Sequence, residues 1–216
     1  MAGCRLSPIP RLYASLPAPL DRHALSCRDG PCLSPGDRLL FRGVGFTLAP
    51  GDALHLAGAN GIGKSSLIRI LTGLMQPFAG TVARQGTIAL LDERSALDPH
   101  LPLGRALAFW AGVDGADSAQ GTQAAELLGL AQLLDVPVRY LSTGQKKRAA
   151  LARMIGQQAP LWLLDEPLNG LDKDAVGLVE TLVQDHCRAG GIAVIASHQP
   201  FVLANMERFE LERHIP

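Results

Sequence analysis

The sequence contains few aromatic residues, few cysteines and no surplus of charge. Phe, Trp and Tyr make up 5% of the 216 residues, so Leu, Ala, Val and Ile must fill the core. Lys and Arg number 20 and Asp and Glu number 20, which gives a formal net charge of zero. Non-specific affinity for nucleic acid comes mainly from basic side chains that neutralise phosphates, so this balance argues against a nucleic-acid partner. A hydrophobic content of 47% excludes a fully disordered chain.

Long apolar runs are also missing. No stretch of about 18 consecutive apolar residues exists, so we expect membrane contact only through partner chains. The first twenty residues contain Arg5 and Arg11, as a signal peptide could. Four prolines nevertheless interrupt every segment that could form its apolar part: Pro8, Pro10, Pro17 and Pro19. We therefore expect residues 1–20 to be a disordered tail or a mis-assigned start, followed by one folded domain.

The cysteines do not form a disulfide framework in a chain of this size. There are four of them: Cys4, Cys27, Cys32 and Cys187. Cys27 and Cys32 lie five residues apart in a stretch rich in proline and glycine, with no second pair to complete a zinc site. Reduced thiols, as in a cytosolic protein, are the favoured interpretation.

Apolar periodicity predicts an α/β fold. Two uninterrupted apolar runs, residues 161–164 and 192–196, are typical of strands that are covered on both faces of a parallel sheet. Further strands are predicted at residues 39–48, 53–57, 80–84 and 87–91. Helices are predicted at residues 65–74, 103–110, 122–130, 131–134 and 142–157. Because no strand pattern interrupts them, we expect an inserted helical subdomain at roughly residues 97–157. His55, inside a predicted strand, is expected to be a hydrogen-bonded core side chain rather than a ligand.

A glycine-rich loop carries the strongest chemical signal. Residues 58–65 read GANGIGKS and match the pattern G-x-x-x-x-G-K-[ST]. Its glycines let successive backbone N–H groups converge on phosphates, and the helix that follows adds the positive end of its dipole. We predict that Lys64 reaches the β- and γ-phosphates and that the Ser65 hydroxyl binds Mg²⁺. A plain turn between a strand and a helix is the alternative. The predicted nucleotide-binding residues are Gly58, Ala59, Asn60, Gly61, Ile62, Gly63, Lys64, Ser65 and Ser66.

An acidic pair, Asp165 and Glu166, follows the apolar run at 161–164. At the C-terminal end of a buried parallel strand, beside the glycine-rich loop, Asp165 is placed to hold Mg²⁺ through its water shell. Glu166, one residue further along, is placed to polarise an attacking water. Alone, the sequence Asp-Glu-Pro would be an ordinary turn. The glycine-rich loop favours the catalytic interpretation, because ATPases with such a loop need a second acidic site.

A pentapeptide upstream of this acidic pair resembles a known signature. It consists of Leu141, Ser142, Thr143, Gly144 and Gln145. Ser142 and Gln145 fit a capping box, which is the purely structural interpretation. The pentapeptide also resembles the LSGGQ signature of ATP-binding cassette (ABC) ATPases, which in that family contacts the γ-phosphate held by the opposite protomer. Backbone N–H groups and the dipole at a helix N-terminus suit such a contact.

The resemblance to ABC ATPases covers residues 39–201. Residues 169–172 resemble the family's D-loop, with Asp172 at its end, and His198 matches the switch histidine that touches the γ-phosphate. The resemblance implies a P-loop fold with a mostly parallel core sheet, an antiparallel β subdomain and a helical subdomain, all within a nucleotide-binding domain at residues 21–216. It implies ATP and Mg²⁺ as cofactors, Glu166 and His198 as catalytic residues, a homodimer of cassettes, and membrane subunits as partners.

Three segments narrow the resemblance to the ATP-binding subunits of bacterial cytochrome c maturation systems. They read LSTGQKKRAALARM at 141–154, LWLLDEP at 161–167 and HCRAGGIAVIASHQP at 186–200. This implies haem export or handling at the cytoplasmic face of the inner membrane. Other functions remain open: the ATPase of another small-substrate transporter, or a non-transport, ATP-gated assembly subunit. ABC ATPases of DNA or translation carry long insertions or second cassettes for which 216 residues leave no room.

The sequence also departs from the family pattern. ABC ATPases usually carry a glutamine in the loop after the strand at 87–91, where it binds Mg²⁺ and contacts the membrane subunit. Here that loop, Asp92–Ser95, has no glutamine, which keeps the non-hydrolysing alternative open. No aromatic residue is identified to stack on adenine, because Tyr13 is distant in sequence and Phe41 is expected in the core. Residues 30–36 resemble an insertion near the position of the base.

Overall fold

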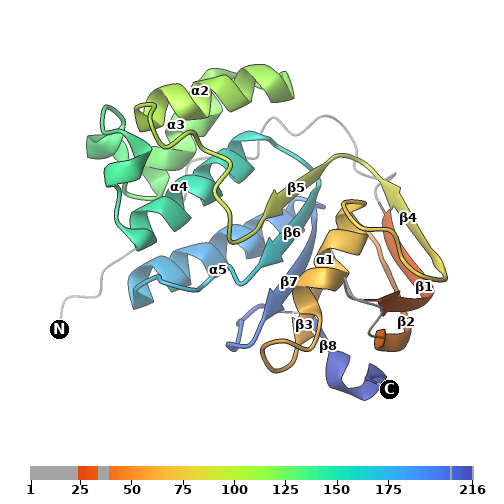
Figure 1. The fold of residues 1–216 in the computed structure, drawn as a ribbon. Coiled ribbons are helices and arrows are strands. Elements are labelled where there is room, and N and C mark those ends of the chain that lie inside the picture. The colour runs from red at the N-terminus through yellow and green to blue at the C-terminus, as the bar shows by residue number, and fades with distance from the viewer. Residues whose placement is uncertain (1–23, 34–38, 205, 216) are drawn as a thin grey trace.

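The computed structural model describes residues 24–33, 39–204 and 206–215, in two sheets and a set of helices (Figure 1). Its strands are β1 (Ala24–Leu33), β2 (Leu39–Leu48), β3 (Ala53–Ala57), β4 (Thr81–Gln85), β5 (Ile88–Leu91), β6 (Leu161–Asp165), β7 (Ile192–Ser197) and β8 (Met206–Glu210). Its helices are α1 (Lys64–Thr72), α2 (Leu103–Asp114), α3 (Ser118–Leu127), α4 (Thr143–Gly156) and α5 (Lys173–Arg188). Short 3₁₀ turns are η1 (Ala131–Leu133), η2 (Val138–Tyr140) and η3 (Leu211–His214). The predicted tail at residues 1–20, and Tyr13 with it, lies outside the described residues.

The larger sheet is parallel, as predicted. Its five strands lie in the order β5-β6-β7-β3-β8, and each neighbouring pair runs in parallel. Every residue of β3, β6 and β7 is buried, because helices and the smaller sheet cover both faces. This explains why these strands read as uninterrupted apolar runs. It also brings the C-terminal ends of three sequence-distant strands to one edge of the sheet.

The smaller sheet is antiparallel and has the order β2-β1-β4. We predicted no strand before residue 39, so β1 was missed. Its register against β2 shifts at three places between Cys27 and Leu33, and such irregularities break the alternation that marks a strand in sequence. Residues 30–33, interpreted above as the start of an insertion, instead form the end of β1, and residues 34–38 lie outside the described parts of the chain.

One further strand and one α-helix also had no predicted range. Strand β8 pairs in parallel with β3 at the edge of the larger sheet, but its sequence, MERFE, is mostly charged and none of its residues is fully buried. Helix α5 is amphipathic and is capped at its N-terminus by Asp172, whose Oδ1 accepts a hydrogen bond of 2.8 Å from Ala175 N–H. An edge strand exposed on one side carries few apolar residues, so its sequence resembles that of a loop.

Helix α1 is shorter than predicted. It ends at Thr72, because Gly73 adopts a left-handed conformation (φ 85°) whose N–H closes the last turn on Ile70. Such a glycine stop is the usual end of a helix. Leu74, which the sequence placed on the apolar face of this helix, therefore lies beyond it and is 70% exposed.

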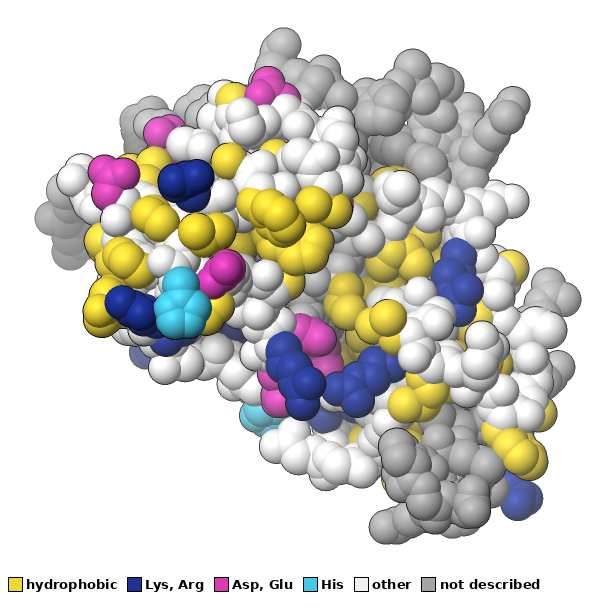
Figure 2. All heavy atoms as spheres, turned by 45° about the horizontal axis from the view of Figure 1, so that its top comes forward, with side chains coloured by type: hydrophobic (Ala, Val, Ile, Leu, Met, Phe, Trp, Pro, Cys, Tyr) yellow, Lys and Arg dark blue, Asp and Glu magenta, His cyan; other side chains and the backbone are white. Residues whose placement is uncertain are grey.

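Helices α2, α3 and α4 pack together at one side of the larger sheet (Figure 1). The backbones of α3 and α4 approach closely: a Cβ on Gly156 would lie 3.0 Å from the Cα of Gly121. Helix α2 runs four residues further than predicted, and α3 begins at Ser118 because the Asp117 side chain caps it. Apolar side chains gather on the surface of this helical group (Figure 2). In helix α2, Phe109 and Val113 are exposed. The subdomain boundary at 97–157 stays a prediction.

Two further findings bear on the composition-based expectations. No helix in the described parts of the chain is long and apolar enough to cross a membrane. Cys27 and Cys187 are buried, and the Cys27 Sγ lies 3.9 Å from the Val44 carbonyl oxygen. The described residues include no group of three or more histidine, cysteine or acidic side chains arranged to hold a metal ion. Burial raises the pKa of the Cys187 thiol to about 11, so this side chain stays protonated.

A buried histidine explains part of the segment at 186–200. The His186 ring stacks on Trp162, with centroids 3.9 Å apart, and its Nε2 lies 3.1 Å from the Pro160 carbonyl oxygen. A Cβ on Gly191 would lie 2.2 Å from His186 Nε2, so only glycine fits there. His186 and Gly191 are therefore packing partners within the core. Burial lowers the pKa of His186 to about 4.

Because the pKa of His186 is lowered in the folded protein, we expect the stability of the protein to depend on pH. The folded protein keeps His186 neutral because burial lowers its pKa. Its contribution to the free energy of unfolding is therefore fully present above the unfolded-state pKa near 6.5 and is lost as the pH falls towards 4. Between pH 7 and pH 5 we expect this group alone to reduce the free energy of unfolding by about 2 kcal/mol. In His186→Phe, whose ring can still stack on Trp162, urea unfolding should lose that part of its pH dependence. An unchanged difference between the two pH values would contradict the assignment.

Candidate nucleotide-binding site

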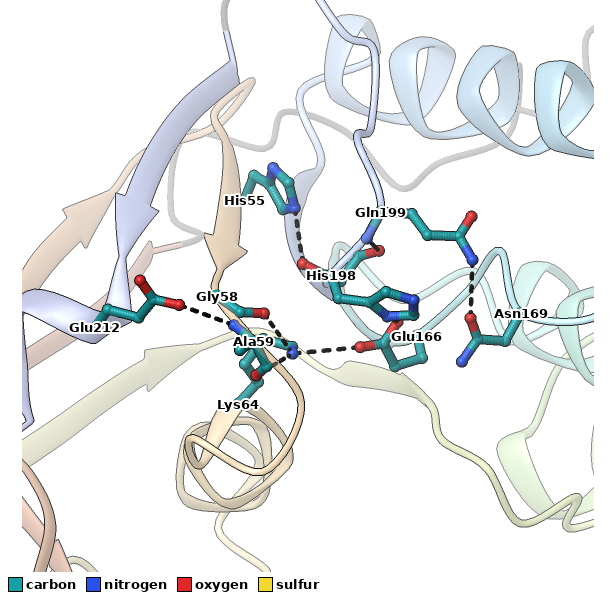
Figure 3. A network of polar contacts seen from close by, with 10 residues as sticks. His55, Gly58, Ala59, Lys64, Glu166, Asn169, His198, Gln199 and Glu212 are labelled. Atoms are coloured by element: carbon teal, nitrogen blue, oxygen red, sulfur yellow. Dashed lines mark hydrogen bonds and ion pairs between the residues drawn. The ribbon is translucent and has the colours of Figure 1, made fainter.

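The candidate site forms where three parallel strands end. Strand β3 leads into the glycine-rich loop, β6 ends at Asp165 and Glu166, and β7 leads to His198. Because β6, β7 and β3 are neighbours in the sheet, the side chains that follow them meet at its edge (Figure 3). A cavity of about 350 Å³ lies there, lined mainly by residues of the loop and of α1: Asn60, Gly61, Gly63, Lys64, Ser65 and Ser66.

Lys64 is held at the mouth of the loop. Its side chain is 5% exposed, and its Nζ donates hydrogen bonds to the carbonyl oxygens of Gly58 (2.9 Å) and Ala59 (3.0 Å). The same ammonium forms a buried ion pair with Glu166 Oε1 at 3.4 Å. A buried ammonium is stable only when oxygen atoms surround it, and two carbonyls and a carboxylate supply them here.

Glu166 joins Lys64 to His198. Its Oε2 lies 2.9 Å from His198 Nδ1, so one carboxylate contacts both side chains. Its backbone has a left-handed conformation (φ 46°), which is costly for a residue with a side chain. The Glu166 N–H donates to the Ala196 carbonyl oxygen at 2.8 Å, which fixes this turn to β7. The strained backbone therefore aims the carboxylate into the site.

Asp165 offers a buried and incompletely bonded carboxylate. The residue is 5% exposed and accepts a hydrogen bond from the Ser65 side chain, while its Oδ1 has no hydrogen-bond partner among the described residues. Burial raises the pKa of Asp165, with Glu166 and Glu93 adding to the rise and Ser65 opposing it. A hydroxyl beside a carboxylate oxygen without a partner is a donor set that fits Mg²⁺.

Two charged residues near the site were missed. Glu93 lines the cavity at the loop, and with Lys147 it also lines a neighbouring cavity of about 400 Å³. Burial lowers the pKa of Lys147, while the carboxylates of Asp165 and Glu93 act against this shift. Glu93 stands in the loop that lacks glutamine, and Lys147 lies two residues after the pentapeptide. Both positions were visible in the sequence, but their convergence depends on the packing of α4 beside the sheet.

The pentapeptide forms the predicted helix cap. Ser142 Oγ accepts from Gln145 N–H at 3.2 Å, and Gln145 Oε1 accepts from Ser142 N–H at 2.8 Å. Leu141 is buried, and Thr143 lines the 400 Å³ cavity rather than the cavity at the loop. A Cβ on Gly144 would lie 2.9 Å from the Gly170 carbonyl oxygen, so the start of α4 packs closely on the segment after β6. Within one chain, the pentapeptide lines no part of the cavity at the loop.

Four other residues named in the sequence analysis lie near the site or in the core beside it. His55 is buried and lies 3.2 Å from the Ser197 carbonyl oxygen through Nε2, and Phe41 is in the core, so both predictions are confirmed. Asp172 caps α5. Asn169 Oδ1 accepts a hydrogen bond of 3.1 Å from Gln199 Nε2, which joins the segment after β6 to the segment after β7. The expected functional roles of Asp172 and of the pentapeptide stay predictions.

The fold and this edge of the sheet define a phosphate-loop ATPase of the ABC type. The family model described as "ABC transporter" matches residues 41–169. Among solved structures, an ABC transporter ATP-binding protein from Pyrococcus furiosus superimposes with a TM-score of 0.79 at 21% identity, covering 89% of this chain and all of that one. A dimeric bacterial ABC transporter cassette gives a TM-score of 0.73 at 18% identity, covering 81% of this chain and 88% of that one.

Curated relatives are much more similar in sequence. A cytochrome c biogenesis ATP-binding export protein from Novosphingobium aromaticivorans is 58% identical over 181 residues, 84% of this chain and 92% of the relative. A protein of the same description from Rhodospirillum rubrum is 41% identical over 193 residues, 84% of this chain and 83% of the relative. The chain therefore belongs to the ABC transporter ATPases and, among them, to the family of cytochrome c biogenesis ATP-binding export proteins. It is an ATP-hydrolysing enzyme.

Proposed function

We propose that this chain is the ATPase subunit of an ABC complex that exports or handles haem for the maturation of c-type cytochromes. The complex would lie at the bacterial inner membrane, with this chain on its cytoplasmic face beneath separate membrane subunits. Relatives described as cytochrome c biogenesis ATP-binding export proteins support the assignment to cytochrome c maturation and to export. The observation that carries the ATPase chemistry is the convergence of Lys64, Glu166 and His198 at one sheet edge.

Each of these three side chains has a distinct chemical role in the proposal. Lys64 leaves the loop carbonyls and Glu166 to bind the β- and γ-phosphates as a point charge. Glu166, released from Lys64, accepts a proton from the attacking water as a general base. His198 holds the Glu166 carboxylate in place and contacts the γ-phosphate. The side chain of Leu40 on β2, which lines the cavity at the loop, supplies apolar surface for the base.

Ser65 and Asp165 would hold Mg²⁺, with Asp165 acting through a water molecule. When bound, the ion neutralises charge on the phosphate oxygens. The Ser65 hydroxyl and the free Oδ1 of Asp165 are the donor set that supports this assignment. Glu93 stands in the loop where the family usually carries glutamine, and it lines the cavity at the glycine-rich loop together with Glu166, as a second carboxylate.

Two copies of the chain would share two nucleotides in the active arrangement. Residues 141–145 of one copy would face the glycine-rich loop of the other, with Asp172 near the contact. In a single chain, residues 141–145 line no part of the cavity at the glycine-rich loop, where the phosphates would bind. A second copy would supply that site, and the solved neighbour described as dimeric supports such an arrangement for the fold.

Ser142 separates the structural and functional roles of the pentapeptide. Ser142→Ala removes one half of the capping box and should reduce the free energy of unfolding by about 1 kcal/mol. Ser142→Arg should abolish ATP hydrolysis in the dimer, while each monomer still binds ATP because the glycine-rich loop is unchanged. Phosphate release and nucleotide titration on the same preparations measure both effects. Full ATPase activity in Ser142→Arg would reduce this residue to a helix cap.

The transport function is tested in a strain that carries this chain as its only copy of the cassette. Covalently bound haem in c-type cytochromes, detected by peroxidase stain, should disappear in Glu166→Gln and remain in Glu126→Gln, which changes an exposed residue of α3. Phosphate release from the purified chain, with and without its membrane subunits, separates the alternatives. Normal c-type cytochromes in a Glu166→Gln strain whose complex no longer releases phosphate would exclude the haem assignment. If c-type cytochromes are lost in the Glu166→Gln strain but the purified wild-type complex releases no phosphate, the ATP-gated assembly subunit would be favoured.

A further inference from the structure

A carboxylate from the end of the described chain reaches the glycine-rich loop. Glu212, in η3, accepts a hydrogen bond of 3.1 Å from the backbone N–H of Ala59, the second residue of the loop. The two residues are 153 positions apart in sequence. Figure 3 shows the Glu212 side chain pointing at this peptide from the side opposite Glu166 and His198. No motif in the sequence assigns Glu212 a role.

The turn that carries Glu212 is firmly anchored. Leu211 is fully buried, and His214 Nδ1 lies 3.0 Å from the Arg42 carbonyl oxygen in β2. The His214 ring stacks on Phe209 of β8, with centroids 4.8 Å apart. Strand β8 itself pairs along the whole of β3, the strand that leads into the loop. Glu212 is therefore delivered to Ala59 by a rigid support and not by a free terminus.

The Ala59 residue is held from two directions. Its N–H is bound by Glu212, and its carbonyl oxygen is bound by Lys64 Nζ at 3.0 Å. The backbone turns sharply just before it: Gly58 has a φ of 147°, and a Cβ there would lie 2.0 Å from Ile62 Cδ1. When Lys64 turns to a phosphate, its bond to Ala59 is given up. The Glu212 carboxylate then still binds the backbone N–H of Ala59.

We propose that Glu212 is a positioning residue for nucleotide binding, which holds the start of the glycine-rich loop in its phosphate-binding shape through the Ala59 N–H. This rests on the proposed function of the loop. The hydrogen bond of 3.1 Å to the Ala59 N–H restricts the start of the loop, and an ordered loop loses less conformational entropy when a phosphate binds. The role belongs to the hydrogen bond rather than to the negative charge, so a neutral acceptor of the same length replaces Glu212.

Two variants of the full chain separate the bond from the charge. Glu212→Ala removes both, and Glu212→Gln keeps a side-chain oxygen that accepts from Ala59 N–H. Glu207→Ala, at an exposed position of β8, is the matched control. Amide hydrogen exchange over residues 58–63 is measured without nucleotide, and dissociation constants are measured for ATP and ADP. In Glu212→Ala we expect the Ala59 amide to exchange at least about tenfold faster and both nucleotides to bind about threefold to tenfold more weakly. Glu212→Gln and Glu207→Ala should match the wild type.

Each outcome decides the inference. Wild-type affinities and exchange rates in Glu212→Ala overturn it. Suppose that Glu212→Gln and Glu212→Ala weaken nucleotide binding equally, while amide exchange at Ala59 rises only in Glu212→Ala. The weaker binding would then follow from the lost charge and not from the lost hydrogen bond, which also overturns the proposal. Tighter binding in both variants would make Glu212 an electrostatic opponent of the nucleotide. If the wild type binds neither nucleotide, the proposed function fails first, and the exchange rates still report whether Glu212 orders the loop.

Discussion

Glu166→Gln is expected to reduce ATP hydrolysis by about 10²–10⁴-fold without weakening ATP binding. Glutamine keeps the size of the side chain and its contact with His198 but cannot accept the proton of the attacking water. The substitution also removes the carboxylate that pairs with Lys64 at 3.4 Å, so the ammonium is freer to bind phosphate. Unhydrolysed ATP should then remain between two copies and hold them together. Phosphate release and size-exclusion chromatography with Mg-ATP measure the two effects.

The experiment needs the assembled complex as well as the isolated chain, because the loop at Asp92–Ser95 lacks the usual glutamine and wild-type turnover is expected to be slow alone. Glu126→Gln on α3 is the matched control, since this glutamate is exposed and far from the sheet edge in sequence. Hydrolysis at the wild-type rate in Glu166→Gln, within the complex, would show that another group activates the water. The catalytic assignment of Glu166 would then have to be withdrawn.

Lys64→Ala is expected to weaken nucleotide binding by about tenfold to a hundredfold or to abolish it. Lys64 is the only charged side chain within residues 58–65, and a charge-assisted hydrogen bond contributes about 1.5–3 kcal/mol. Titration with a fluorescent nucleotide measures the loss, and phosphate release should fall with it. The two substitutions therefore differ in kind: Lys64→Ala removes binding, whereas Glu166→Gln removes only the chemical step.

Lys173→Ala, at the exposed start of α5, is the control for loss of one lysine. Because Lys64 is buried against Glu166, its removal leaves a buried carboxylate without its cation, and the free energy of unfolding should be measured in parallel. A double variant, Lys64→Ala with Glu166→Gln, should recover stability but not nucleotide binding. Unchanged affinity in Lys64→Ala, with the fold intact, would contradict the phosphate-loop assignment.

Local patterns in the sequence were sufficient wherever a short segment carries its own physical signal. The apolar runs of β6 and β7 predict buried parallel strands because both faces of these strands are covered. The glycines of the loop and the Ser142–Gln145 cap are recognisable because each depends on bonds within a few residues. These signals, together with their order along the chain, were enough for the fold class and for most of the candidate site.

Signals of this kind failed for elements that depend on distant partners. Strand β1 has an irregular register against β2, and β8 is a charged edge strand that exists because β3 offers it backbone partners. Neither has a period of its own that a sequence pattern can detect. The end of α1 was misplaced by two residues because the apolar period continued to Leu74, whereas the left-handed Gly73 stops the helix.

By itself, the sequence determined which residue types are present for phosphate chemistry and on which kind of element each lies. Only the tertiary structure decided how they meet. The left-handed backbone that aims Glu166 at Lys64 is fixed by a bond to β7, and the approach of Glu93 and Lys147 depends on the packing of α4. The bond from Glu212 to Ala59 spans 153 residues. Such contacts are set by the register of parallel strands and the packing of helices, which bring together residues whose spacing along the chain carries no trace of their proximity.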